Sequence, residues 1–291
     1  MDALGTIRKF KEILPLICDA ETSADPKGWT PDNPLWGHCA VVSLIAQNLF
    51  GGELLRVSLE DTKFANMKSH YWNRLIGGRE IDFTEDQFCG ERPQGLTPVV
   101  RARSYPLSHD ATKKRYKLLA WRLAKALNQE NALFEDDIYR ACFNAALDSS
   151  CQKFWVGCVI TNCSGMIYRG CNKILEPLKY FCDPKCIRFS IQSRTESMIG
   201  ACGHAEEFAI WEMVRRKIPL SECEFYAAGF FTDFMPYNKK YPEFTCLRCA
   251  SQIYLAGVKT VYVPFEGRWV GLTAEECVKQ AAAYATKEKA A

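Results

Sequence analysis

Two short stretches of the chain, about forty residues apart, carry side chains that could bind a transition metal and move a proton. His204 begins the first stretch, and Glu206 follows it closely. Cys246 and Cys249 form a C-x-x-C pair in the second. One imidazole and two thiolates leave the fourth position of a tetrahedral zinc site open for water, as in catalytic rather than structural sites. The sequence therefore predicts Zn²⁺ bound by these three residues, with the carboxylate of Glu206 left to transfer protons.

This pairing of H-x-E with C-x-x-C resembles the signature of zinc-dependent base deaminases. Residues 132–265 resemble the cytidine deaminase-like superfamily, of the cytidine and deoxycytidylate deaminase type. The resemblance implies the same three zinc ligands and a proton-shuttle role for Glu206. In such chemistry zinc lowers the pKa of a bound water, so that hydroxide forms near neutral pH and attacks the base. Glu206 would take the proton and return it to the ring nitrogen and then to the leaving ammonia.

The same resemblance implies how the substrate is bound. Asn172 resembles the asparagine that contacts the substrate sugar, and backbone groups near Ala205 and Cys246 would hold the attacked ring. The expected substrate is an aminated base, most often cytosine, in a nucleoside, a nucleotide or a single-stranded nucleic acid. Thr245 stands where the family usually has a proline, which indicates a divergent branch. Many proteins of this fold assemble, so a homo-oligomer is expected by analogy.

The segment from residue 173 to 203 is longer than the fold requires. Four thiols near it either bind a second, structural zinc ion or are free cysteines: Cys171, Cys182, Cys186 and Cys202. The segment also combines basic side chains with aromatic rings that could stack on bases, namely Lys179, Lys185, Arg188 and Arg194 with Tyr180 and Phe181. Such a set suits a nucleotide phosphate, a single-stranded nucleic acid or simply a solvated loop.

A second set of reactive residues lies in the first half of the chain. Cys39 stands in the first turn of an apolar helix that ends at Gly51, where the helix macrodipole favours a thiolate. His70 and Asp82 lie on two predicted strands joined by a glycine turn. This arrangement favours a Cys–His–Asp triad, in which the base activates the thiol and the acid orients the base. A buried thiol and a hydrogen-bonded core histidine are the alternative.

Residues 5–128 resemble the YunG family and, more distantly, papain-like and transglutaminase-like cysteine folds. The matching segments are residues 35–40, 50–53, 70–74, 81–84 and 116–119. The family usually has a glutamine at the position of His38. The resemblance implies an N-terminal α+β domain of the cysteine-protease type. It also leaves an alternative function open, a cysteine hydrolase or amidase whose zinc domain serves recognition, and a third, in which both domains only bind.

Hydrophobic periodicity predicts the elements that position these residues. The length of 291 residues suits two domains, 1–130 and 131–291, divided at a short polar run. In the second domain we expect a helix at 133–149, strands at 156–160, 166–170, 224–228 and 258–264, helices starting at His204 and Cys246, and a helix at 273–285. This order predicts an α/β fold with a three-layer α-β-α arrangement. Both metal-binding helix starts should then meet at one sheet edge.

The composition of the chain indicates in which cellular environment the protein is expected. A net charge of +3 is too small to indicate a dedicated nucleic-acid-binding protein. No apolar run approaches the roughly 20 residues that span a bilayer, and Met1 to Leu4 do not begin a signal peptide. We therefore expect no membrane association and a cytoplasmic location. The 15 cysteines are then mostly small buried hydrophobic residues rather than disulfides.

Overall fold

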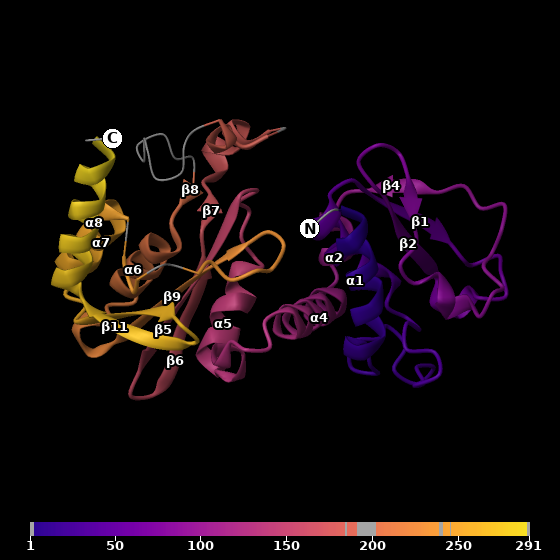
Figure 1. The fold of residues 1–291 in the computed structure, drawn as a ribbon, viewed down its shortest axis with the longest axis horizontal. Coiled ribbons are helices and arrows are strands. Elements are labelled where there is room, and N and C mark those ends of the chain that lie inside the picture. Colours follow the sequence, from indigo (N-terminus) through magenta and orange to yellow (C-terminus); the bar gives the residue numbers. More distant parts are fainter. Residues whose placement is uncertain (1–2, 184, 191–201, 239–240, 245, 290–291) are drawn as a thin grey trace. The chain divides into compact units, whose positions relative to one another are not determined.

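The computed structural model describes residues 3–183, 185–190, 202–238, 241–244 and 246–289. Arg194 and Thr245, named above, lie outside these ranges. The chain divides into two compact units, residues 1–127 and 128–291, each with a sheet of its own (Figure 1). The division falls beside the short polar run at residues 128–131.

The N-terminal unit combines helices with a four-stranded antiparallel sheet of order β3-β2-β1-β4. Its elements are α1 (Ala3–Ile17), α2 (Cys39–Phe50), β1 (Glu53–Ser58), β2 (Ser69–Arg74), β3 (Glu80–Ile81), β4 (Val99–Arg101), α3 (Ser104–Leu107) and α4 (Asp110–Leu127). Helix α2 is buried along most of its length and packs on β2 and on α4. Asn73 of β2 ties it to the sheet, donating from Nδ2 to the Ser43 carbonyl at 3.0 Å.

The C-terminal unit contains the remaining α-helices and β-strands of the described chain. They are α5 (Asp137–Ala146), β5 (Phe154–Asn162), β6 (Gly165–Cys171), β7 (Lys173–Ile174), β8 (Cys202–Gly203), α6 (Ala205–Arg215), β9 (Glu224–Phe231), α7 (Leu247–Leu255), β10 (Thr260–Phe265), β11 (Arg268–Thr273) and α8 (Ala274–Lys289). Short 3-10 helices occur in both units. They are η1 (Ala65–Met67) and η2 (Glu85–Phe88) in the N-terminal unit, and η3 (Ala132–Glu135), η4 (Glu176–Cys182), η5 (Ile187–Phe189) and η6 (Leu220–Glu222) in the C-terminal unit.

The main sheet of this unit has the order β11-β10-β9-β5-β6. Strands β9 and β10 run parallel and the other neighbours antiparallel, while β7 and β8 form a separate pair. Helix α5 covers one face, and α6, α7 and α8 lie on the other (Figure 1). The predicted α/β class is confirmed. Strand β11 was not predicted, and it lies between the predicted strand at 258–264 and the predicted helix at 273–285.

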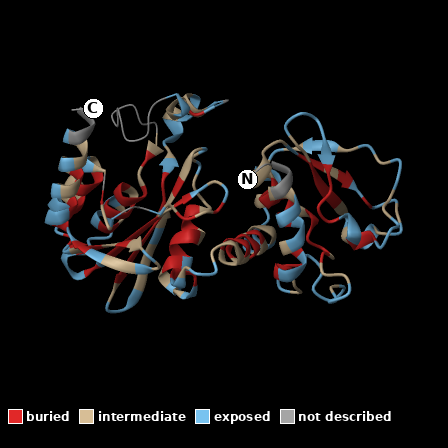
Figure 2. Cartoon of the chain, in the orientation of Figure 1, coloured by how far each residue is buried: buried red, intermediate tan, exposed pale blue. Residues whose placement is uncertain are grey.

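Two apolar layers hold the sheet between its helices. On the side of α6, α7 and α8, fully buried residues such as Ala209, Phe225 and Ile253 form one continuous cluster. On the α5 side, the Tyr139 ring lies 5.4 Å from that of Phe230. Figure 2 shows α5 and the central strands as predominantly buried. This double burial makes the sheet a rigid support for the helix starts at its edge.

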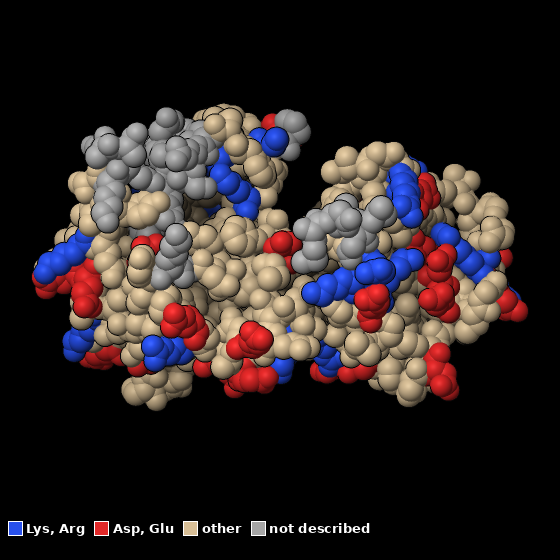
Figure 3. Space-filling view, viewed as in Figure 1, with Lys and Arg blue, Asp and Glu red and all other residues tan. Residues whose placement is uncertain are grey.

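Charge is mixed on the face of the molecule that Figure 3 shows, where lysine and arginine alternate with aspartate and glutamate in both units. That distribution agrees with the small net charge of +3. In the described part of the chain, no helix is both long and apolar enough to cross a bilayer.

Gly157 is required where α5 crosses the sheet. A Cβ atom added there would lie 1.8 Å from the carbonyl oxygen of Cys142, an atom of the α5 backbone. The obstacle is backbone rather than a side chain that could turn away, so any larger residue must push α5 off β5.

We therefore expect Gly157→Ala to destabilise the C-terminal unit by about 1–3 kcal/mol or more, the usual cost of overpacking. Urea unfolding of the whole chain, followed by release of bound zinc to a chromophoric chelator, reports on this unit. Gly271→Ala, on β11 of the same sheet, is the matched control, because the nearest atoms to its Cβ would belong to side chains and lie at least 3.1 Å away. Equal stability of the two variants would contradict the proposed close contact.

Candidate functional site

The predicted metal-binding residues lie at the starts of two helices. His204 is the N-cap of α6 and Cys246 the N-cap of α7, both with extended backbone. Cys249 follows in the first turn of α7, where it is fully buried. Since the N-terminus of a helix carries partial positive charge, these positions favour thiolates over thiols.

The three side chains converge on one point. His204 Nδ1 lies 3.1 Å from Cys249 Sγ and 3.4 Å from Cys246 Sγ. Among the described residues, these form the one set of three potential metal ligands whose donor atoms all lie within 4.8 Å of one another. One nitrogen and two sulfur donors, with a fourth tetrahedral position left for water, suit a catalytic zinc ion. The donor set therefore fits the predicted Zn²⁺.

Of the three ligands, only Cys246 already favours its metal-binding form, because the hydrogen bond with Cys246, followed by burial, raises the pKa of Cys249. The hydrogen bond from Cys249, followed by that of His204, lowers the pKa of Cys246 to about 4 despite burial. The Cys246 thiolate in turn raises the pKa of His204 to about 9. Because zinc takes a neutral imidazole, metal binding would replace the proton on His204.

Glu206 lies beside the ligands in the first turn of α6. Only 9% of the residue is exposed, and its Oε2 accepts a hydrogen bond from Cys249 Sγ at 3.8 Å. Burial raises the pKa of the Glu206 carboxyl, more than the His204 charge lowers it. A carboxyl group that can hold a proton next to a metal centre is suited to general acid–base catalysis.

Asn172 has a different set of partners from the one expected. Its Oδ1 accepts from the Val156 N–H at 2.8 Å and from Ser149 Oγ at 2.9 Å. Its Nδ2 donates to the Phe154 carbonyl at 2.9 Å. The amide thus fixes the loop between α5 and β5, leaving at most its second N–H for a sugar. Ala205 is fully buried at the first position of α6.

Glu207 is a functional residue that the sequence analysis missed. Its Oε2 accepts from the His204 backbone N–H at 2.9 Å, and its Oε1 accepts from Gln252 Nε2 at 2.9 Å. Glu207 also forms an ion pair with Arg248, which lies between the two cysteine ligands. One carboxylate therefore joins the start of α6 to the start of α7. An acidic residue at the third helical position is a capping-box signal that could have revealed half of this role.

In the N-terminal unit, the structure brings the three predicted triad residues together. His70 Nε2 lies 2.6 Å from Asp82 Oδ2, and Cys39 lies close enough to interact with the His70 ring. The other ring nitrogen, Nδ1, lies 3.3 Å from Gln87 Nε2, and Cys39 Sγ donates to the Ser69 carbonyl at 3.9 Å. Burial alone would lower the pKa of His70, but the interactions with Asp82 and Cys39 raise it to about 9. Cys39 begins α2 and His70 lies on β2, as predicted, whereas Asp82 directly follows the short strand β3 instead of lying within it.

His38 is not an alternative base. Its Nε2 lies 2.8 Å from Thr22 Oγ1 and its Nδ1 lies 2.9 Å from the Trp36 carbonyl, so both ring nitrogens are used to hold the loop before α2. The ring is completely buried, and burial lowers the pKa of His38 to about 4.

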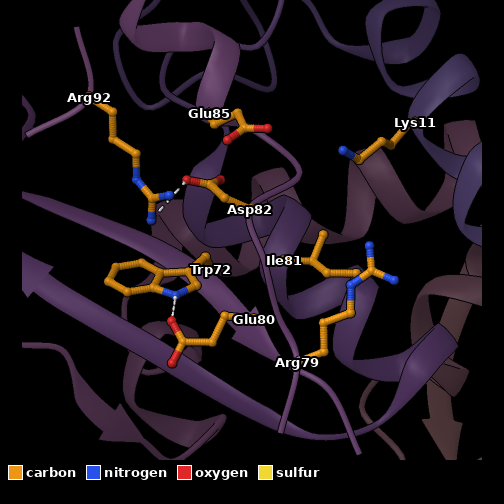
Figure 4. A pocket seen from close by; sticks show the side chains of 8 residues that line it. All are labelled: Lys11, Trp72, Arg79, Glu80, Ile81, Asp82, Glu85 and Arg92. Carbon is orange, nitrogen blue, oxygen red and sulfur yellow. Dashed lines mark hydrogen bonds and ion pairs between the residues drawn. The ribbon is translucent and has the colours of Figure 1, made fainter. Parts of the chain in front are cut away.

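A cavity of 220 Å³ opens on the acid side of the triad. Figure 4 shows Arg92 reaching toward Asp82, with the two groups 3.6 Å apart, and Trp72 donating to Glu80. Lys11 of α1 lines the opposite wall (Figure 4). Among the described residues that line this cavity, Asp82 is present and Cys39 is not. The cavity therefore reaches the orienting acid and not the thiol.

Two family models match separate parts of the chain. Residues 6–128 match the YunG protein family. The uncharacterized protein YunG of Bacillus subtilis (strain 168) is 26% identical over 100 residues, which cover 34% of this chain and 78% of the relative. The predicted resemblance of the N-terminal half is confirmed, while its likeness to cysteine-protease folds stays a prediction.

Residues 134–264 match the cytidine and deoxycytidylate deaminase zinc-binding region. A crystal structure of cytidine deaminase from Burkholderia pseudomallei is similar over 48% of this chain and 92% of its own, with 16% identity and a TM-score of 0.33. The match of the family confirms the predicted zinc-dependent deaminase domain and its zinc cofactor.

We expect Glu207→Ala to weaken zinc binding by about 10–100-fold, the usual effect of losing a residue that orients metal ligands. Without this carboxylate, Arg248 and the His204 N–H lose their shared partner and the two helix starts separate. Competition with a chromophoric chelator measures the affinity. Glu212→Ala is the matched control, since Glu212 lies on the same helix and pairs only with the surface residues Arg215 and Arg216 in the described contacts. Wild-type affinity in Glu207→Ala would refute the assigned role.

Proposed function

We propose that this chain, which joins a YunG domain to a cytidine and deoxycytidylate deaminase zinc-binding region, hydrolyses the amino group of cytosine in a nucleoside or nucleotide. The observation that carries the proposal is the convergence of His204, Cys246 and Cys249 within 4.8 Å. Glu206 lies next to them on the same helix start. A buried carboxyl beside an open three-ligand set is what a hydrolytic metal centre needs.

The residues of the site have separate roles in the proposed reaction. His204, Cys246 and Cys249 would hold the ion, which when bound supplies a water acidic enough to lose a proton near neutral pH. Glu206 accepts that proton and delivers it to N3 of the cytosine ring as the oxygen adds to C4. A second proton transfer through Glu206 lets the C4–N bond break and ammonia leave. Cytosine and water thus become uracil and ammonia, with every proton accounted for.

The charge distribution supports a small substrate over a polymer. Lys179 pairs with Glu176 at 2.7 Å, and Lys185 lies over the Phe189 ring at 5.1 Å. The rings of Tyr180 and Phe181, 4.3 Å apart, contact each other. The predicted basic and aromatic loop therefore has partners within itself. A free nucleoside or nucleotide needs fewer phosphate contacts than a strand does.

We expect Glu206→Gln to lower the rate of ammonia release by about 10²–10⁴-fold, the usual contribution of a general acid–base residue. The amide keeps the size of the side chain but cannot cycle a proton, so zinc content should stay unchanged. Cys39→Ala, in the other unit, should leave the rate at the wild-type level. Ammonia release that survives Glu206→Gln with zinc bound would disprove this mechanism.

A second candidate function lies in the N-terminal unit. The 2.6 Å contact between His70 and Asp82, with Cys39 close to the ring, favours a thiol nucleophile for acyl transfer from an amide or ester. All three residues are buried.

If this triad is active, iodoacetamide should alkylate Cys39 faster than the exposed Cys89 of the same unit, despite the burial of Cys39. His70→Asn should remove the advantage by taking away the base. Peptide mapping by mass spectrometry follows both thiols in one sample. Slower labelling at Cys39 than at Cys89, unchanged in His70→Asn, would identify Cys39 as a structural thiol.

A further inference from the structure

Three segments that are distant in the sequence are tied together beside the short β7–β8 pair. Ile174 of β7 pairs with Cys202 of β8 and donates its N–H to Ser150 Oγ at 2.8 Å. Gln152 bridges to the inserted segment, since its Nε2 donates to the Cys182 carbonyl and its Oε1 accepts from the Cys186 N–H, each at 2.9 Å. These bonds bring residues 149–154, 173–183, 185–186 and 202–203 to one place.

Each of the three segments contributes cysteine thiols to that place. The Cys151 and Cys202 thiols lie close enough to interact with each other. Cys182 interacts in the same way with Cys186 and Cys202. The backbone bonds described above therefore bring four interacting thiols to one place.

We propose that Cys151, Cys182, Cys186 and Cys202 form a second metal site, a closed four-thiolate site for Zn²⁺ with a structural role. The spacing Cys182-x-x-x-Cys186 lies within the range usual for zinc ligands. Four sulfur donors leave no position for water, so such a site stabilises the fold and performs no hydrolysis. It is distinct from the deaminase centre in its ligands.

The surroundings of Cys151 are suited to a metal-bound sulfur. The backbone N–H groups of Lys153 and Phe154 donate to its sulfur. Its own N–H donates to Ser149 Oγ at 3.1 Å, and its carbonyl accepts from Trp155 Nε1 at 2.9 Å. The thiol is thus held in a fixed position, with donors that offset the charge a bound thiolate retains.

Cys151 takes the place that the sequence assigned to Cys171. Cys171 is buried at the end of β6, where it interacts with Cys158 and Tyr168 of the main sheet. Sequence proximity to the insertion favoured Cys171, but the path of the chain brings Cys151 to the insertion through Gln152. The predicted second zinc site therefore keeps three of its four residues.

The second site has to contract around its ion. Among the described residues, only the donor atoms of the His204 set all lie within 4.8 Å of one another. Tetrahedral zinc with Zn–S bonds of about 2.3 Å places its sulfur atoms about 3.8 Å apart. The insertion that carries Cys182 and Cys186 must accordingly move toward Cys151 and Cys202 on metal binding.

Such a site would act on the catalytic centre through the backbone. Cys202 is two residues from His204, and β7 directly follows Asn172. Fixing β8 to β7 would hold in place the backbone next to both His204 and Asn172. This consequence rests on the proposed function, whereas the presence of the second ion does not.

Zinc content after dialysis against buffer without metal tests the site. The wild-type chain should hold about two zinc ions, and Cys151→Ser or Cys182→Ser about one. Cys171→Ser and the exposed Cys163→Ser should keep about two. The double variant His204→Ala/Cys249→Ser should keep about one ion, and its cobalt derivative should show the strong thiolate charge-transfer absorption of a four-sulfur site.

The result that overturns the proposal is about one zinc ion per wild-type chain, lost entirely in the His204→Ala/Cys249→Ser variant. Loss of an ion in Cys171→Ser but not in Cys151→Ser would overturn the ligand assignment. If Cys151→Ser does not fold, the cobalt spectrum of the double variant still decides. None of these readouts depends on ammonia release, so failure here and failure of the deaminase proposal are distinguishable.

Discussion

The C-terminal unit depends on holding the N-terminal ends of two helices against each other. His204 comes from the start of α6 and both cysteine ligands from the start of α7, so no single element forms the centre. Two helix N-termini that carry like partial charges do not attract each other. Glu207 supplies the negative charge between them and bonds to both. Glu207 is nearly buried, whereas 35% of its partner Arg248 is exposed, so water screens part of this ion pair.

The rest of the unit keeps these helix starts in place. The sheet is buried on both faces, and Gly157 lets α5 approach close enough for its aromatic residues to pack on β9. Asn172 joins the end of β6 to the start of β5 and, through Ser149, to the loop that precedes β5. The insertion between β7 and β8 then leads back to His204. The sheet, the loop and the insertion therefore all help to fix the metal-binding residues at one edge of the sheet. The chemistry needs those residues in fixed positions.

The parts that were predictable are those determined by local sequence. Residue types two and three positions apart revealed His204, Glu206 and the C-x-x-C pair, and apolar periodicity located the helices that they begin. Strand β11 was missed because its alternation is short and follows directly on a turn at Gly267. The link from Glu207 to Arg248 was missed because it joins residues that only the fold brings together. The exchange of Cys171 for Cys151 has the same cause, since the chain path decides which of 15 cysteines reach one loop.

The central claim is that His204, Cys246, Cys249 and Glu206 form a centre that replaces the amino group of cytosine by oxygen from water. The most direct measurement is mass spectrometry of cytosine, cytidine, deoxycytidine and their monophosphates after incubation with the zinc-loaded chain in ¹⁸O-labelled water. We predict a product about 3 mass units heavier than its substrate, with the label on the base, against about 1 unit in ordinary water. Unchanged masses across the panel, or a deaminated product without the label, would contradict the account.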